Sequence, residues 1–145
     1  MFAWSDALPY IVAQCAGAIA GIIGAHLMFD LVPLSIGISA RSGASQWLSE
    51  GIATFALVLA ILGGVRHAPQ AVPWLVGLTI IAAYWFTAST SFANPAVTLA
   101  RGFTAKFAGI APNDVPGFVL AQLGGAATGL LVARVIFAPT SLRIN

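Results

Sequence analysis

The chain has 145 residues, of which 59% are hydrophobic and only 7% are charged, and its mean hydropathy is +0.95. Soluble domains carry about 25% charged residues, so this chain has too little polar surface to cover a globule in water. The net charge of +2 comes from six scattered basic residues, which excludes a basic stripe for nucleic acid. Composition therefore favours a membrane protein whose main partner is lipid.

Cysteine and histidine provide no metal site or disulfide in the sequence. Cys15 lies alone in an apolar run, and neither His26 nor His67 has a ligand neighbour at metal-site spacing. We therefore expect no catalytic residues, no metal and no cofactor, and the chain is not expected to be an enzyme. The opening residues lack the positive region of a secretory signal peptide, so the first apolar run is expected to be a membrane helix.

Four long apolar segments are the main predicted elements, because a helix needs about 20 residues to cross the hydrocarbon core. A Gly- and Ser-rich linker that contains Arg41 separates the first two segments. The sequence thus predicts an all-α membrane protein with a single domain over residues 1–145. The predicted transmembrane helices are residues 8–29, 47–65, 72–86 and 115–137.

A short fifth element follows the third segment, where the sequence turns abruptly polar and reads TASTSFANPAVTLAR from Thr87 to Arg101. Asn94 can cap a helix whose first turn tolerates Pro95. A helix over residues 94–103 would be about 15 Å long, half of a hydrocarbon core of about 30 Å. Irregular backbone at that depth is tolerated where it lines a wet cavity, and the positive helix end disfavours cations. This element predicts a pore for neutral solutes.

An internal repeat appears when the first and last spans are aligned at an offset of 108 residues, which matches Asp6 with Asp114 and Gln14 with Gln122. Membrane transport proteins are often built from such repeats, and an odd number of spans inverts the second copy. A complete first copy would begin about sixty residues before Met1. We therefore expect an N-terminally truncated chain with one full repeat and the last helix of the other.

Both matched spans carry two glycines four residues apart, which allow helices to approach closely in lipid. We interpret these four positions as helix-packing sites: Gly17, Gly21, Gly125 and Gly129.

Glu50 is an acidic residue inside the second span, where a carboxylate is costly and usually faces a cavity or the bundle interior. Two interpretations are open. Glu50 could be a proton relay in a carrier, or it could accept hydrogen bonds from backbone donors of an irregular loop. The second is favoured because it satisfies the charge and the loop together.

Asn94, Pro95 and Ala96, preceded by the polar run and followed by a short helix, resemble the NPA motif of the major intrinsic proteins, the aquaporins and glycerol facilitators. The resemblance covers the whole chain, and it implies an aquaporin-like fold in which the four segments are the third to sixth spans. It also implies that Asn94 offers its amide to the solute, that Pro95 and Ala96 contact the opposite half-helix, and that Glu50 braces the re-entrant loop.

Two positions in the expected selectivity region, Val97 and Ala82, depart from the family pattern, and the missing first half is a third departure. Val97 stands where the family usually has an arginine, Ala82 stands where strict water channels often have histidine, and Ser91 precedes the motif. These residues predict a wider, less polar constriction. Arg101 lies four residues after Val97, on the same helical face, and could be a displaced vestibule arginine or an interfacial anchor. The TASTSF and NPAVTL stretches resemble a bacterial branch found with arsenic-resistance genes.

The expected function is passive conduction of water, glycerol or arsenite-like small neutral solutes across the inner membrane by a multi-pass channel. The resemblance implies a homo-oligomer, a tetramer in the family, or pairing with a complementing half. A proton-coupled carrier using Glu50 with Arg101, and a nonconducting truncated fragment, are the alternatives. Basic residues are nearly balanced between the two sides, with one set at Arg66, His67, Arg134 and Arg143 and the other at Arg41, Arg101 and Lys106.

Overall fold

The structure, a computed structural model, describes residues 3–137. Within this range every regular element is helical, and four of the helices are long and apolar enough to cross a membrane. This confirms the predicted all-α class of membrane protein. Short 3₁₀ turns precede three of the long helices, at Trp4–Asp6, Pro69–Ala71 and Pro112–Asp114. The α-helices are α1 (Ala7–Met28), α2 (Ala44–His67), α3 (Val72–Phe86), α4 (Pro95–Arg101) and α5 (Val115–Ile136).

Two helices differ from their expected ranges by more than one residue. The helix α2 extends past the expected 47–65 at both ends, because its polar flanking residues remain helical. The short helix α4 ends at Arg101, before the expected residue 103. There the N–H groups of Gly102 and Phe103 donate to carbonyls only three residues back, so the chain tightens into a turn.

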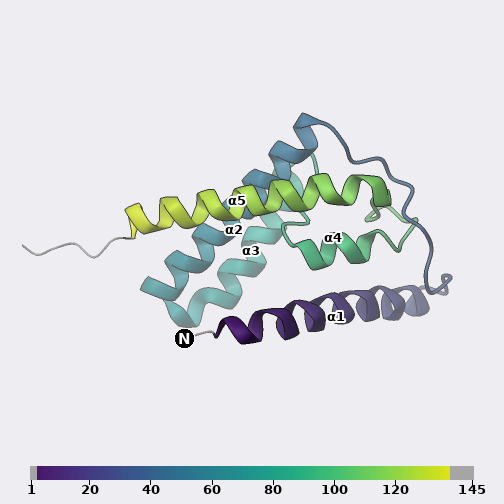
Figure 1. The fold of residues 1–145 in the computed structure, drawn as a ribbon, viewed down its shortest axis with the longest axis horizontal. Coiled ribbons are helices and arrows are strands. Elements are labelled where there is room, and N and C mark those ends of the chain that lie inside the picture. The colour runs from purple at the N-terminus through teal and green to yellow at the C-terminus, as the bar shows by residue number, and fades with distance from the viewer. Residues whose placement is uncertain (1–2, 138–145) are drawn as a thin grey trace, which may run out of the picture.

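The helices α2 and α5 form the closest packed pair and cross at an angle in the view of Figure 1. Gly125 of α5 is buried, and a Cβ there would overlap the carbonyl oxygen of Gly51. A Cβ at Gly129 would lie 3.1 Å from the Phe55 oxygen and the Val58 side chain. Both glycines therefore let the two helix backbones approach closely, as small residues do in membrane bundles.

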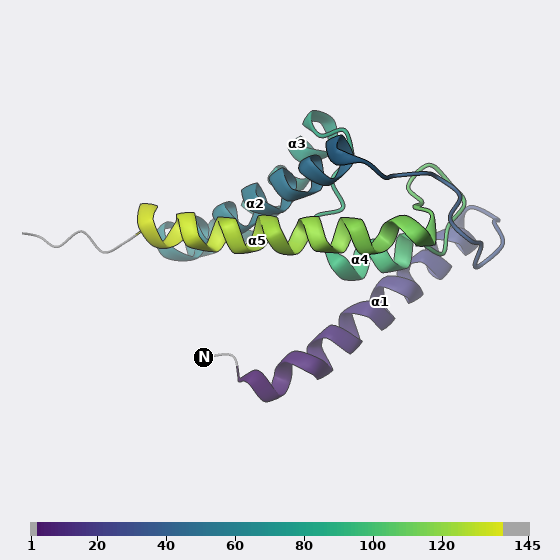
Figure 2. The same ribbon diagram turned by 45° about the horizontal axis from the view of Figure 1, so that its top comes forward.

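Packing at Gly17 and Gly21 of α1 was expected but is not found among the described residues. Both glycines are exposed, and a Cβ at either would meet no atom within 4 Å. The reason is the position of α1, which lies beside α4 and diverges from the other long helices toward its N-terminal end (Figure 2). No described helix covers the face of α1 that carries the two glycines, so their packing role stays a prediction.

We expect Gly125→Ala to destabilise the protein, because its new methyl group would overlap the Gly51 backbone. Overpacking of this kind costs about 1–3 kcal/mol. Thermal unfolding in detergent, followed by circular dichroism, would measure the loss. Gly124→Ala is the matched control, since its Cβ would meet nothing within 4 Å. Equal unfolding temperatures for the two variants would contradict the close approach.

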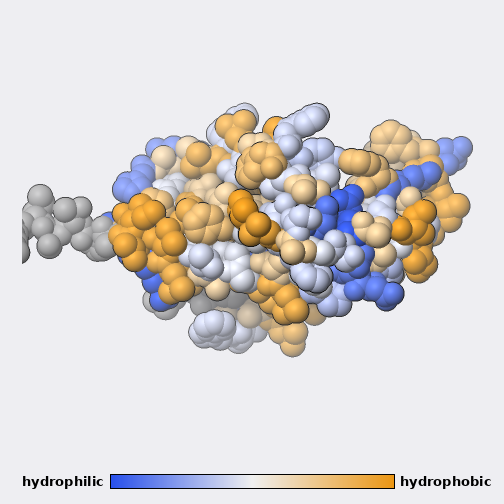
Figure 3. Space-filling model, turned by 90° about the horizontal axis from the view of Figure 1, so that it is seen from above, coloured by the Kyte–Doolittle hydropathy of each residue, from blue (hydrophilic) through white to orange (hydrophobic). Residues whose placement is uncertain are grey.

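The distribution of polarity is the reverse of that in a soluble protein. Large apolar side chains lie outside, with Trp85 82% and Met28 79% exposed, and orange hydrophobic residues are spread over the face seen in Figure 3. Polar groups lie inside, where Glu50 is 0% and Gln122 1% exposed. Lipid satisfies the apolar exterior, whereas the buried polar groups must find partners within the protein.

Candidate pore loop and its supports

The loop between α3 and α4 has a backbone conformation that few residues adopt. Thr90, Ser91 and Ala93 have φ angles of 62°, 46° and 48°, in the left-handed region that is uncommon for residues other than glycine. Such conformations persist only when surrounding groups hold them. The supports of this loop therefore decide its shape.

Glu50 of α2 is the main support of the loop. Its Oε1 accepts hydrogen bonds from the Ser89 hydroxyl at 2.6 Å and the Phe92 N–H at 2.8 Å. Its Oε2 accepts from the Ala93 N–H at 2.9 Å and the Gln122 amide at 2.7 Å. Four donors surround a carboxylate that is fully buried, so its charge is satisfied by hydrogen bonds.

Gln122 extends this network from α5 to α4. Its Nε2 donates to Glu50 and also to the Thr98 hydroxyl at 2.8 Å. Thr98 in turn donates from Oγ1 to the Asn94 carbonyl at 2.9 Å. One chain of hydrogen bonds thus links α2, α5 and α4 and fixes the start of α4 relative to the two packed helices.

Asn94 caps α4 with one atom of its side chain and leaves another free. Its Oδ1 accepts from the Ala96 N–H at 2.8 Å and the Val97 N–H at 3.3 Å, as expected for an N-cap residue. The side-chain Nδ2 makes no hydrogen bond with any described residue, and Asn94 lines a cavity of about 580 Å³ between α1, α4 and α5. The free amide can therefore donate to a molecule in that cavity.

Free acceptors lie directly before Asn94 in the loop. Within residues 3–137, no hydrogen bond reaches the carbonyl oxygens of Ser91, Phe92 or Ala93. The Ser91 hydroxyl is also unpartnered, although the residue is only 3% exposed. Buried polar groups normally have partners, so these oxygens can accept hydrogen bonds from water or a small solute.

Arg41 is a second support of the loop. Its place in a Gly- and Ser-rich linker did not indicate this role. Its guanidinium donates to the carbonyls of Ser89 at 3.0 Å, Phe107 at 2.8 Å and Gly109 at 2.7 Å, and to the Thr90 hydroxyl at 3.4 Å. The only available signal was that Arg41 is the single cation of the linker.

The charge of Arg41 is buried and has no directly paired acid. Its backbone N–H donates to Asp114 at 2.7 Å, but in the described part of the chain no carboxylate forms an ion pair with the guanidinium. Burial lowers the pKa of Arg41, and the Coulombic effects of Glu50 and Tyr84 partly oppose this shift. The guanidinium remains protonated at neutral pH.

Phe92 lies against two cations. The Arg41 Cζ is 5.1 Å from the centre of its ring, and the Arg101 Cζ is 4.1 Å from it, within cation–π range. One Arg101 nitrogen, Nη1, is buried without a partner. Arg101 also borders a cavity of about 320 Å³ that it shares with His26, Thr104 and Lys106. The structure thus brings Arg101 close to the loop, but from the α1 side.

The remaining residues of the expected selectivity region are less directly involved in the hydrogen-bond network. Val97 is half-buried in α4, and Ala82 of α3 is exposed. Pro95 is exposed and Ala96 buried, and both border the cavity beside Asn94.

His26 is a second polar residue whose part the sequence did not indicate. It is buried, and its Nε2 lies 2.8 Å from the Thr104 hydroxyl, while Nδ1 lies 2.7 Å from the Val32 carbonyl. These hydrogen bonds hold the end of α1 to the turn after α4. No group of three or more metal-binding side chains occurs in residues 3–137.

Basic residues lie at both ends of the bundle. Arg66 and Arg134 border one groove near the C-terminal ends of α2 and α5, whereas Arg41 and Arg101 meet at Phe92. Arg143, which was assigned to the first group, lies outside the described residues.

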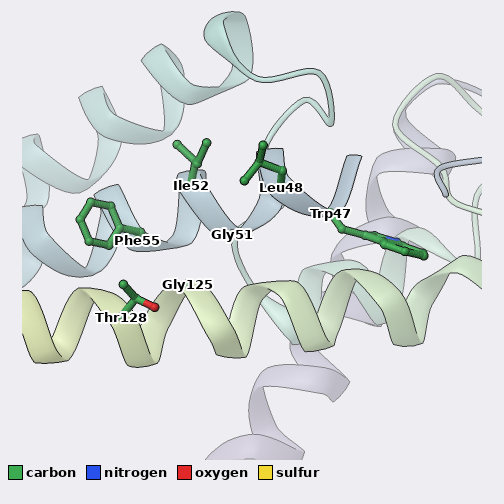
Figure 4. Close-up of a pocket in the computed structure, with 7 residues that line it drawn as sticks. All are labelled: Trp47, Leu48, Gly51, Ile52, Phe55, Gly125 and Thr128. Carbon is green, nitrogen blue, oxygen red and sulfur yellow. The ribbon is translucent and has the colours of Figure 1, made fainter. Parts of the chain in front are cut away.

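A separate groove of about 450 Å³ lies between α2 and α5 (Figure 4). Its walls are almost entirely apolar and are formed by Trp47, Leu48, Ile52 and Phe55 of α2 and by Gly125 and Thr128 of α5. It contains none of the polar groups around Asn94, so the loop remains the candidate site.

Comparison with known proteins gives one informative match. The chain is 60% identical over 134 residues to aquaglyceroporin AqpS of Rhizobium meliloti (strain 1021), and the match covers 92% of this chain. The chain spans only 58% of the length of that protein. No family model matches the chain, and no solved structure matches it.

Proposed function

We propose that this chain, a member of the major intrinsic protein family by its likeness to an aquaglyceroporin, forms part of a channel for small uncharged solutes. The observation that carries the proposal is the free donor of Asn94, which lines a cavity of about 580 Å³ and follows directly in the chain after three free carbonyls. Donors and acceptors in a row can replace the hydration of a neutral solute as it passes.

The proposed role of the motif follows from the direction of α4. Asn94 presents its amide, and Pro95 and Ala96 shape the surface that meets an opposite half-helix. The N-terminal end of α4 also disfavours cations, although a helix of seven residues contributes only a small dipole. Glu50 braces the loop, and its four hydrogen bonds favour this role over that of a proton relay paired with Arg101.

The proposed constriction is wide and weakly polar. Val97 and Ala82 supply small apolar surfaces, and Ser91 supplies a single hydroxyl. A pore without bulky polar groups at its narrowest point would pass solutes larger than water. We therefore propose glycerol and arsenite-like neutral species as cargo in addition to water.

We further propose that the conducting unit contains a second half, supplied by another copy or by a complementing segment. The cavity beside Asn94 is walled by Gln14 and Cys15 of α1 on one side and by Leu99 and Val119 on the other. The proposed location is the inner membrane, as a multi-pass protein.

Swelling of proteoliposomes tests the proposed function. Liposomes containing the chain should swell in isotonic glycerol or arsenous acid faster than empty liposomes, at a rate independent of an imposed pH gradient. A rate that follows the pH gradient would indicate a coupled carrier. If the chain is inactive alone, but conducts when produced with an added upstream half, it is a nonconducting fragment by itself.

A further inference from the structure

Arg41 stands out because its charge is buried but is not cancelled by an ion pair. The residue is 9% exposed, and its guanidinium nitrogens donate only to carbonyl and hydroxyl oxygens. Neutral acceptors satisfy the N–H groups without removing the net positive charge. In a medium of low dielectric constant, such a charge acts over a longer distance than it would in water.

The place of this charge is fixed by the loop itself. Nη1 of Arg41 bonds to Ser89 and Thr90, directly before the segment whose free carbonyls lead to Asn94. The backbone N–H of Arg41 is held by Asp114, so both its main chain and its side chain are anchored. The guanidinium is therefore held against Ser89 and Thr90, the part of the loop that comes shortly before Asn94 in the chain.

The uncharged residue Val97 makes the position of the Arg41 guanidinium important. The residue after the Asn94, Pro95 and Ala96 motif contributes no charge, so α4 itself provides no cation next to the motif. Arg101, the other cation against Phe92, faces the cavity shared with His26 and Lys106. Both cations lie against Phe92, but of the two only Arg41 donates hydrogen bonds to the loop among the described residues.

We infer that Arg41, reaching in from the connection between α1 and α2, is the specificity-determining residue that excludes cations from the solute path. This inference rests on the proposed channel function. A fixed positive charge raises the energy of a passing cation but has little effect on a neutral solute. Selection against charge thus comes from a residue distant in sequence from the motif.

The test compares potassium flux with glycerol flux in the same proteoliposomes, using the full chain in whichever assembly conducts glycerol. Arg41→Gln should raise the ratio of potassium flux to glycerol flux by at least about tenfold, whereas Arg41→Lys should keep that ratio low. Arg134→Gln is the matched control, because Arg134 is exposed at the far end of α5. It should change neither flux.

A second pair of variants keeps Arg41 and its hydrogen bonds to carbonyls in place. The Thr90 hydroxyl lies 3.4 Å from Nη1, so Thr90→Asp would put a carboxylate beside the guanidinium and neutralise it. Thr90→Asn has nearly the same shape without the charge, and both residues tolerate the left-handed backbone there. The aspartate variant should admit potassium and the asparagine variant should not.

Each outcome decides the inference. Potassium flux that stays low in both Arg41→Gln and Thr90→Asp, while glycerol still passes, would overturn it. A leak caused by Arg101→Gln but not by Arg41→Gln would overturn it in favour of Arg101. If Arg41→Gln does not fold, the Thr90 pair decides. Absence of glycerol flux in every assembly of the unaltered chain would instead overturn the proposed channel, and this assignment with it.

Discussion

Glu50→Ala should abolish the native fold of the loop and lower the stability of the whole chain by at least about 3 kcal/mol. The substitution leaves four donors without their acceptor in a fully buried site, and each buried unsatisfied group costs about 1–3 kcal/mol. The left-handed residues Thr90, Ser91 and Ala93 would then lose the groups that hold them. Thermal unfolding in detergent, followed by tryptophan fluorescence, measures the effect.

Glu50→Gln is a finer form of the same experiment. The amide replaces one carboxylate oxygen by an NH₂ group, which would face the backbone N–H of either Phe92 or Ala93. A backbone N–H cannot reverse its role, whereas the Ser89 hydroxyl and the Gln122 amide can reorient. We expect a smaller loss than for alanine, about 1–3 kcal/mol. Asp6→Asn, at an exposed carboxylate, is the control, and equal stability of the two variants would refute the bracing role.

Asn94→Asp should preserve α4 but reduce glycerol flux by about tenfold or more. A carboxylate at the N-cap still accepts from Ala96 and Val97, and the helix dipole favours it. The free Nδ2 donor is lost, however, and a negative charge takes its place. Loss of one hydrogen bond to the passing solute, about 1–1.5 kcal/mol, corresponds to about a tenfold change in rate.

The control for this variant is Asn113→Asp, which makes the same chemical change in the exposed turn before α5. Both proteins should reconstitute equally, and circular dichroism should report the same helix content. Undiminished glycerol flux through Asn94→Asp would contradict the role of the Asn94 amide. A parallel fall in both variants would point to a general effect of added charge.

Local signals predicted those parts of the fold that depend on neighbouring residues. Asn94 followed by Pro95 is a cap and a first turn, and α4 begins at Pro95. The polar run before it predicted irregular backbone, because hydroxyl and small residues replace the apolar sequence of α3. Glu50 could be matched to that loop because a buried carboxylate needs donors, and a loop at membrane depth has unpaired N–H groups.

Long-range contacts explain what the sequence did not predict. Arg41 donates to carbonyls that lie 48, 66 and 68 residues further along the chain. Every residue type has a backbone carbonyl, so no local sequence pattern indicates which carbonyls accept from Arg41. Similarly, Gly17 and Gly125 occupy matching places in the repeat, but only Gly125 faces a helix within the described chain. The same glycine spacing in two helices therefore has different neighbours, because the fold brings another helix to only one of them.

The left-handed segment of the loop has a kinetic consequence. Glu50 accepts hydrogen bonds from Phe92 and Ala93 of this loop and Arg41 donates to Thr90, so in the proposed channel the loop would be a rigid aperture. A rigid aperture needs no opening and closing cycle for each solute. We therefore expect flux to rise in proportion to the solute gradient without saturating, with the weak temperature dependence of diffusion.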